Sequence, residues 1–214
     1  MSRTFKILNK ITGGLSKPSK MPGHAFSISA QRCITGGKLR DVEGSVCRNC
    51  YACGGRYLFD KTVNAMERRY QTLMSSPTEW VDAMVESINK RADKEPYFRW
   101  HDSGDIQSTE HLDMICQVAR GTPTVSHWVP TREYSIVKKY LANGNNIPPN
   151  LNVRLSAHMI DGPAPSGLGL PTSTVIDSGN VTGQPCPAPS QGGECGDCRA
   201  CWDSSVENVT YHIH

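Results

Sequence analysis

The sequence lacks any long apolar segment. No run approaches the roughly 18 consecutive apolar residues that a membrane-spanning helix needs. Residues 1–20 also contain no apolar region of the kind found in secretory signals. We therefore expect a cytoplasmic protein with no membrane partner, in a compartment where thiols stay reduced.

Strong charge of one sign is absent as well. The formal net charge is +3, too small to indicate a nucleic-acid partner by itself. Lysines among Gly, Ser and Pro predict a basic arm over residues 1–24, and this arm is the feature that would suit a phosphate backbone. With 37% hydrophobic and 20% charged residues, the 214-residue chain fits one globular domain with a core of its own.

Cysteine, in contrast, is abundant and regularly spaced. The chain has nine cysteines, an odd number that fits a disulfide scaffold poorly. Eight of them form two sets, each with one outlying cysteine followed by three cysteines at a spacing of three. The sets are Cys33, Cys47, Cys50 and Cys53, and Cys186, Cys195, Cys198 and Cys201. The ninth, Cys116, falls on the apolar face of an expected helix, so we interpret it as a core residue.

The spacing favours an iron–sulfur cluster over zinc. Structural zinc usually takes two separated C-x2-C pairs around one small ion. A C-x2-C-x2-C triplet suits a [4Fe–4S] cluster, and Cys186-Pro187 has the form of the distant ligand in bacterial ferredoxins. One or two clusters are expected, with zinc as the alternative. Each outlying cysteine can join its own triplet or the other one, or a single cluster can leave spare thiols.

Strand-like and helix-like segments alternate through residues 25–161. This alternation predicts an α/β fold with about six mostly parallel strands and crossover helices, either open or curled into a partial (βα) barrel. The expected strands include 25–30, 97–105, 124–131 and 151–159. A capping box at Ser76-Pro-Thr-Glu79 predicts the start of one helix. Residues 162–214 are rich in Gly and Pro at first, carry the second cysteine set, and are expected to complete the same domain.

Polar side chains follow the ends of these strands. Strand alternation would direct Arg99, His101 and Ser103 to one side of the sheet. The same alternation groups Arg154, Ser156 and His158. Because the carboxyl ends of parallel strands share one edge, the pattern predicts a binding site there for a small polar or nucleotide substrate.

Two resemblances enter at these residues. Cysteine–proline followed by "GGECGDCRACWD" and a late Val/Tyr/His run resembles the phage-encoded gene product 88 family. That resemblance implies a phage protein acting in the cytoplasm of an infected bacterial host. It implies no particular activity.

The second, looser resemblance is to radical S-adenosylmethionine (SAM) enzymes. "AFSISA" before the first cysteines, "DSGD" and "NVRLSAHMIDG" are similar to their cluster loop, SAM-binding turn and fourth strand. The resemblance implies a radical-SAM-like partial barrel whose cluster is bound by Cys33, Cys47 and Cys50. It also implies that Asp105 binds the SAM amine and that Arg154 or Ser156 contacts its ribose or carboxylate.

The chain also departs from that pattern. The C-x3-C-x2-C spacing is absent, and Cys53 stands where it can close the cluster. We therefore expect redox or radical chemistry on a small polar or nucleotide substrate, or electron transfer with a redox partner through fully ligated clusters. Whether the chain is an enzyme, and through which catalytic residues, stays open. The alternative is a zinc-stabilised module that binds nucleic acid or protein.

Overall fold

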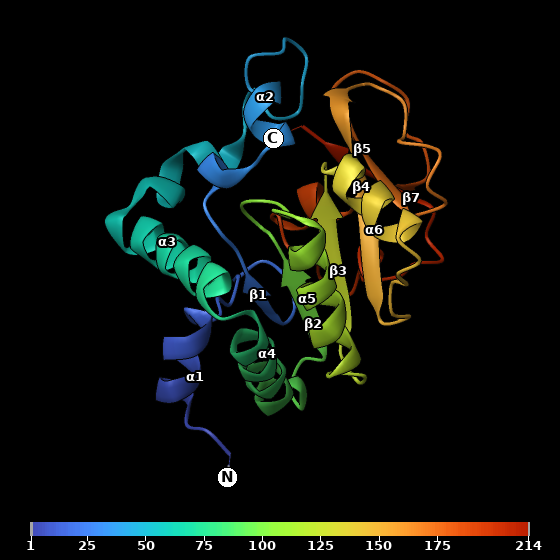
Figure 1. The fold of residues 1–214 in the computed structure, drawn as a ribbon. Helices are drawn as coiled ribbons and strands as arrows, with labels where there is room; N and C mark the ends of the chain where they lie inside the picture. The colour runs from blue at the N-terminus through green and yellow to red at the C-terminus, as the bar shows by residue number, and fades with distance from the viewer. Residues whose placement is uncertain (1, 214) are drawn as a thin grey trace.

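The strands form one sheet in which every neighbouring pair is parallel (Figure 1). The computed structural model describes residues 2–213, and the strand order within them is β1-β2-β3-β4-β5-β7-β6. The strands are β1 (His24–Phe26), β2 (Tyr97–Trp100), β3 (Ser126–Thr131), β4 (Leu151–Ile160), β5 (Thr172–Ile176), β6 (Gln184–Pro185) and β7 (Asn208–His212).

Helices connect the first strands, and short 3-10 turns lie in the cysteine-containing segments. The α-helices are α1 (Phe5–Thr12), α2 (Thr35–Leu39), α3 (Asp60–Ser75), α4 (Pro77–Ala92), α5 (Thr109–Arg120) and α6 (Tyr134–Ala142). In Figure 1, α5 and α6 lie in front of the sheet, and the C-terminal segment lies behind it. Helix α4 begins with Pro77 as its first residue, although the Ser76 side chain makes no capping hydrogen bond.

The expected α/β class with parallel strands and crossover helices is confirmed. The sheet has seven strands where about six were expected, because the two-residue β6 is too short to leave a sequence pattern. The partial barrel is not confirmed. Within residues 2–213 the sheet is open, with β1 and β6 as its edges.

Aromatic side chains fill the helix-covered face of the sheet. Phe98 and Trp100 of β2 pack edge-to-face at a centroid distance of 4.9 Å. Phe26 of β1 meets Trp80 of α4 at 5.2 Å in the same way. Cys116 in α5 is fully buried in this core, as expected.

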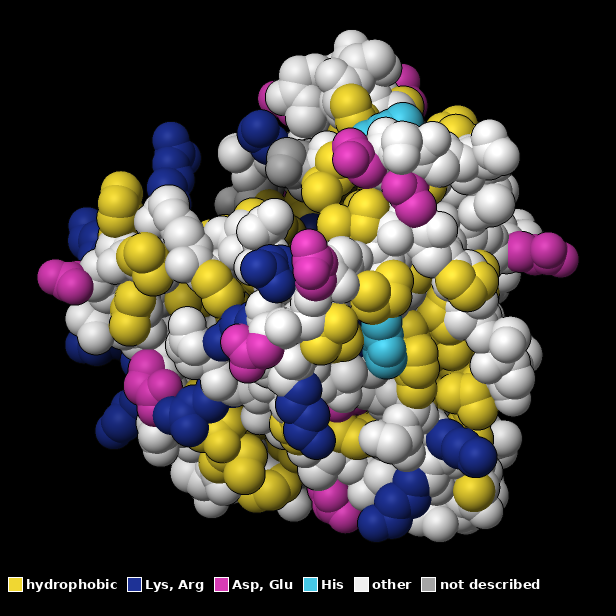
Figure 2. Space-filling view, turned by 90° about the horizontal axis from the view of Figure 1, so that it is seen from above, with side chains coloured by type: hydrophobic (Ala, Val, Ile, Leu, Met, Phe, Trp, Pro, Cys, Tyr) yellow, Lys and Arg dark blue, Asp and Glu magenta, His cyan; other side chains and the backbone are white. Residues whose placement is uncertain are grey.

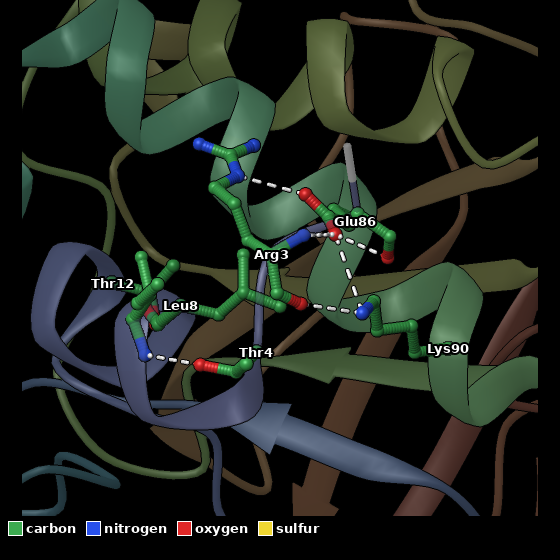
Figure 3. Close-up of polar contacts among 8 residues, drawn as sticks. Arg3, Thr4, Leu8, Thr12, Glu86 and Lys90 are labelled. Atoms are coloured by element: carbon green, nitrogen blue, oxygen red, sulfur yellow. Dashed lines mark hydrogen bonds and ion pairs between the residues drawn. The ribbon is translucent and has the colours of Figure 1, made fainter.

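The N-terminal segment that the sequence suggested as a basic arm contains a docked helix. Leu8 of α1 is fully buried. The Arg3 Nε lies 2.7 Å from a carboxylate oxygen of Glu86 in α4, and Lys90 donates to the Arg3 carbonyl (Figure 3). The neighbouring Arg3 side chain lowers the pKa of Glu86 to about 2. Residues 5–12 therefore belong to the packed structure.

We predict that Leu8→Ala lowers the free energy of unfolding by about 3 kcal/mol, because it removes a fully buried side chain. Urea unfolding measures this change. Ile7→Ala is the matched control, since Ile7 lies on the same helix but is 48% exposed; it should change stability by less than about 0.5 kcal/mol. Equal, small effects of both variants would mean that α1 is not docked in solution.

Candidate functional site

The loop with the first cysteine set lies at the carboxyl ends of the strands. Cys33 follows β1 through a short 3-10 turn at Ala30–Arg32. The segment before Cys47 pairs with the end of β4: Val46 N–H donates to the His158 carbonyl at 2.9 Å, and Ser45 forms an antiparallel bridge with Met159. This edge is where parallel α/β sheets generally bind their ligands.

Three thiols of this set lie close together. A Cβ atom added at Gly36 would stand 3.4 Å from the Cys47 Sγ and 3.7 Å from the Cys33 Sγ, so both sulfurs face the space beside this glycine. Burial raises the pKa of Cys33, and the nearby Asp105, Cys50 and Cys47 raise it further. Burial also raises the pKa of Cys47, with Cys50 and Asp105 again contributing. The structure thus brings Cys33, Cys47 and Cys50 together beside the Asp105 carboxyl.

Cys53 lies on the outer side of this group. Its pKa is raised by burial and then by the neighbouring Cys50. The nearby Arg40 cation acts in the opposite direction and lowers the pKa of Cys53. Among the thiols of this set, Cys50 is therefore the one that acts electrostatically on Cys53.

Two acidic residues stabilise the region around the first cysteine set, and one of them, Glu133, bonds to the loop itself. The Asp105 oxygens accept from Thr131 Oγ1 at 2.6 Å and from the Ile106 and Arg132 N–H groups at 2.8 and 2.9 Å. These contacts join the turn after β2 to the end of β3, and burial raises the pKa of Asp105 to about 6. The Glu133 carboxylate accepts from the two N–H groups that follow Cys33, at 3.2 and 2.7 Å.

The second cysteine set lies in the C-terminal segment. Cys186 N–H donates to the Thr210 carbonyl of β7, and Cys195 N–H donates to the Lys20 carbonyl. Burial raises the pKa of Cys195, followed by Cys186 and Cys198. The Cys201 Sγ lies 3.0 Å from the Tyr211 hydroxyl, and burial raises its pKa to about 11.

Buried polar side chains of β4 bind the loop around Cys201. Arg154 is fully buried and donates to three carbonyls, those of Thr172, Ala200 and Asp203, at 2.7 to 3.0 Å. Asn152 Nδ2 donates to the Cys201 carbonyl at 2.9 Å. Trp202 packs on the same face. These contacts fasten the second cysteine loop over the amino-terminal half of β4.

Three buried donors beside this loop have no hydrogen-bond partner among the described residues: Arg99 Nε, Arg154 Nε and Trp128 Nε1. The Arg99 guanidinium stacks 4.6 Å from the Trp128 ring centroid, and Trp128 meets Trp202 at 5.2 Å. Cys201 is a close electrostatic neighbour of both arginines. The region around Cys201 therefore contains buried donors without an acceptor among the described residues.

Arg99 also connects the two cysteine sets. Its electrostatic neighbours include Tyr51 and Asp102 on the side of the first loop, and Tyr211 and Cys201 on the other. Tyr51 donates from its hydroxyl to the Asp102 carbonyl at 2.5 Å. Arg99 therefore lies on the face of the sheet between the two groups of thiols.

The cofactor-binding residues expected from the radical-SAM resemblance lie in separate environments. Asp105 lies beside the first set, whereas Arg154 binds carbonyls beside the second. Ser156 Oγ accepts from Ser173 Oγ at 3.2 Å, and its carbonyl accepts from the Tyr134 hydroxyl.

His101 does not point with Arg99. Its φ of 57° interrupts the strand alternation, and its ring lies 5.3 Å from that of His111 in α5. The site residues that sequence reasoning missed are Gly36, Glu133, Tyr51 and Tyr211. For Tyr211 a signal existed, because it belongs to the strand-like terminal run.

The cysteine thiols form no disulfide in the described structure, and all nine cysteines are unpaired. Within residues 2–213, no three His, Cys, Asp or Glu side chains are grouped so as to hold one metal ion.

We predict that Arg154→Met lowers the free energy of unfolding by about 3 kcal/mol, because it leaves buried carbonyls without their donor. The exposed Arg120 provides the control, and Arg120→Met should change stability by less than about 0.5 kcal/mol. Urea unfolding of both variants decides the point. Similar stabilities would show that Arg154 does not anchor the loop.

Comparisons with known proteins identify a family only. No curated protein and no solved structure matches the chain, so the radical-SAM resemblance gains no support. Among the described residues, no helix combines the length and apolarity needed to cross a membrane. A family model described as gene product 88 matches residues 5–204. This match spans nearly the whole chain and confirms the resemblance of the C-terminal cysteine segment. The chain belongs to the gene product 88 family.

Proposed function

We propose that this phage-family protein is an iron–sulfur protein with two cluster sites. Cys33, Cys47 and Cys50 would hold the first cluster, and Cys186, Cys195, Cys198 and Cys201 the second. A thiolate-bound cluster supplies one-electron redox chemistry at a potential set by its charge, hydrogen bonds and burial. The redox or radical chemistry would act on a small polar or nucleotide substrate.

The observation that carries the proposal is the group of unpartnered donors beside the second set. Arg99 Nε, Arg154 Nε and Trp128 Nε1 are buried without an acceptor, an arrangement that costs free energy unless an acceptor is present. A cluster bound by four thiolates is anionic and presents sulfur acceptors. The two guanidinium groups near Cys201 would balance its charge.

The electrostatic neighbours support local pairing of the cysteines. The thiols that act on Cys33 are Cys50 and Cys47, and those that act on Cys195 are Cys186 and Cys198. This grouping matches the simplest assignment, in which each outlying cysteine joins its own triplet.

The spacing of the cysteines in the sequence supports a cluster over zinc. One zinc ion requires its sulfurs at about 2.3 Å from a single point, for which a C-x2-C-x2-C triplet is awkward. A cluster accepts thiolates at separate iron atoms, so it suits a wider set. The zinc-stabilised binding module is the alternative that metal analysis would reveal.

Two polar side chains would bind the substrate: Asp105 at the first site and Arg99 between the two sites. One Asp105 oxygen, Oδ2, accepts a single hydrogen bond, from Arg132 N–H. A carboxylate oxygen accepts about two, so Asp105 retains an acceptor position for the amine of a substrate or of SAM. Arg99 would hold a negative group of a substrate between the sites. Arg154 would position the second loop, because its donors are engaged by three carbonyls. Substrate binding would then depend on Asp105 and Arg99.

We predict that anaerobically purified protein contains iron and sulfide and absorbs visible light as clusters do. Cys47→Ala should remove roughly half of the iron, and Cys198→Ala the other half, because each removes a ligand from a different set. Cys116→Ala is the matched control: Cys116 is also a buried cysteine but belongs to neither set, and its removal should leave the iron content unchanged. Iron and acid-labile sulfide assays give the result.

The outcome that contradicts the proposal is equally plain. Colourless protein with stoichiometric zinc would establish the alternative module. Iron lost completely in either single-set variant, with the fold retained, would instead indicate one cluster shared between the sets.

We further predict that Cys53→Ala keeps the iron of the first site, because Cys33, Cys47 and Cys50 act on one another electrostatically, whereas Cys53 is linked to Cys50 alone. The iron content of Cys53→Ala is compared with that of Cys47→Ala. Equal losses would make Cys53 a fourth ligand and favour electron transfer alone. Retained iron leaves a coordination position without cysteine, and formation of 5′-deoxyadenosine from SAM under reduction then tests the radical-SAM form.

A further inference from the structure

An exposed apolar patch surrounds the first cysteine loop. Tyr51, Leu58, Phe59 and Val63 are 53%, 60%, 63% and 41% exposed, and we call these four residues the apolar patch. Large apolar side chains that gather on a surface commonly mark an interaction site.

Local contacts make this patch one continuous surface. The Tyr51 ring lies 5.7 Å from that of Tyr57, which directly precedes Leu58 and Phe59. Val63 N–H donates to the Phe59 carbonyl at 3.0 Å, so Val63 lies on the first turn of α3 above Phe59. The patch therefore runs from the cysteine loop onto α3.

The surface around the patch is positively charged. Residues 31–70 contain eight Lys and Arg against four Asp and Glu, a net charge of +4 in a chain whose net charge is +3. Lys38, Arg48, Arg56 and Lys61 are exposed there, together with the acidic Asp41, Glu43 and Asp60. Viewed toward the carboxyl ends of the strands, Figure 2 shows hydrophobic side chains among Lys and Arg, with Asp or Glu at the margin, at its left side, where Figure 1 places α3.

The patch is also adjacent to the first cysteine set. Tyr51 directly follows Cys50, and Cys53 lies two residues further on. A partner that covers Tyr51 would thus approach the thiols closely. The loop is firmly attached to the sheet beneath, since Tyr57 donates from its hydroxyl to the Asp102 carboxylate at 3.1 Å.

We propose that the apolar patch and its basic rim dock an acidic protein that carries single electrons. This proposal rests on the proposed function. The docked carrier gives up one electron and is oxidised, the cluster bound by Cys33, Cys47 and Cys50 is reduced, and no bond forms or breaks. An apolar centre with a charged rim is the usual composition of such an interface. Opposite charge on the partner raises the association rate.

A protein partner fits this surface better than a nucleic acid does. Leu58 and Val63 are aliphatic, and single-stranded nucleic acids are bound chiefly by stacking on aromatic rings beside a positive groove. Phe59 and the aliphatic residues instead form a compact apolar centre, which suits a small, transient protein contact.

The test uses a fluorescently labelled plant-type [2Fe–2S] ferredoxin, an acidic carrier, and measures its anisotropy with the full-length chain under anaerobic conditions. The double variant Arg56→Glu/Lys61→Glu should weaken binding about tenfold or more, and Phe59→Ser several-fold. Binding to the unchanged chain should fall as salt rises. The control is Lys138→Glu/Lys139→Glu, which makes the same charge change on the exposed face of α6 and should bind as the unchanged chain does.

Equal loss in the α6 control, or affinity that is insensitive to all three variants, would overturn the proposal. Single-stranded DNA or anionic vesicles that bind more tightly than the ferredoxin, with the same dependence on the variants, would also overturn it. A salt-dependent dimer of this chain that is lost in Phe59→Ser would do the same. Iron and sulfide content of every variant is measured in parallel. Docking variants that retain iron but bind as the unchanged chain does refute the docking surface alone, whereas absent iron refutes the proposed function.

Discussion

A guanidinium group buried in a sheet must be surrounded by acceptors, since a buried charge without partners is very costly. Arg154 obtains three of them from backbone carbonyls, two of which belong to the loop that carries Cys201. The arginine and the loop therefore depend on one another. The loop satisfies the charge, and the charge orders a segment that contains few apolar residues. Cys201 and Trp202 lie between the two residues whose carbonyls Arg154 binds, and Cys201 in turn lies beside the Tyr211 hydroxyl.

The first cysteine loop is held by the opposite chemistry. There the anchor is a carboxylate: Glu133 accepts the N–H groups of the two residues after Cys33, while Asp105 joins the turn after β2 to the end of β3. One loop thus presents carbonyls to an arginine, and the other presents N–H groups to an acid. Both attachments leave the thiols free, which is the condition that a thiolate-bound cofactor requires.

The sequence was most informative where spacing repeats. The cysteine sets and the alternation of strands and helices follow from patterns within a few residues, and the parallel α/β sheet was predicted from them. Contacts between distant segments were not predictable in this way. Alternation indicated that Arg154 and Ser156 share a side, but it contained no information on what packs against that side. Helix α1 was missed because its eight residues lie among Lys, Gly and Ser, and because its burial depends on α4. His101 departs from the expected alternation because its backbone is left-handed, a conformation that is not predictable for a non-glycine residue from the sequence.

The attachment of each cysteine loop has a consequence for the order of events during synthesis. The acid that holds the residue after Cys33 lies 99 positions further along the chain, and the strand that pairs with the segment before Cys47 is completed later still. When all four cysteines of the first set have emerged from the ribosome, the distant residues that position them have not yet been synthesised. Closing such long loops costs entropy before any contact rewards it. The thiols would reach their native spacing only after β4 has joined the sheet, when the fold is nearly finished.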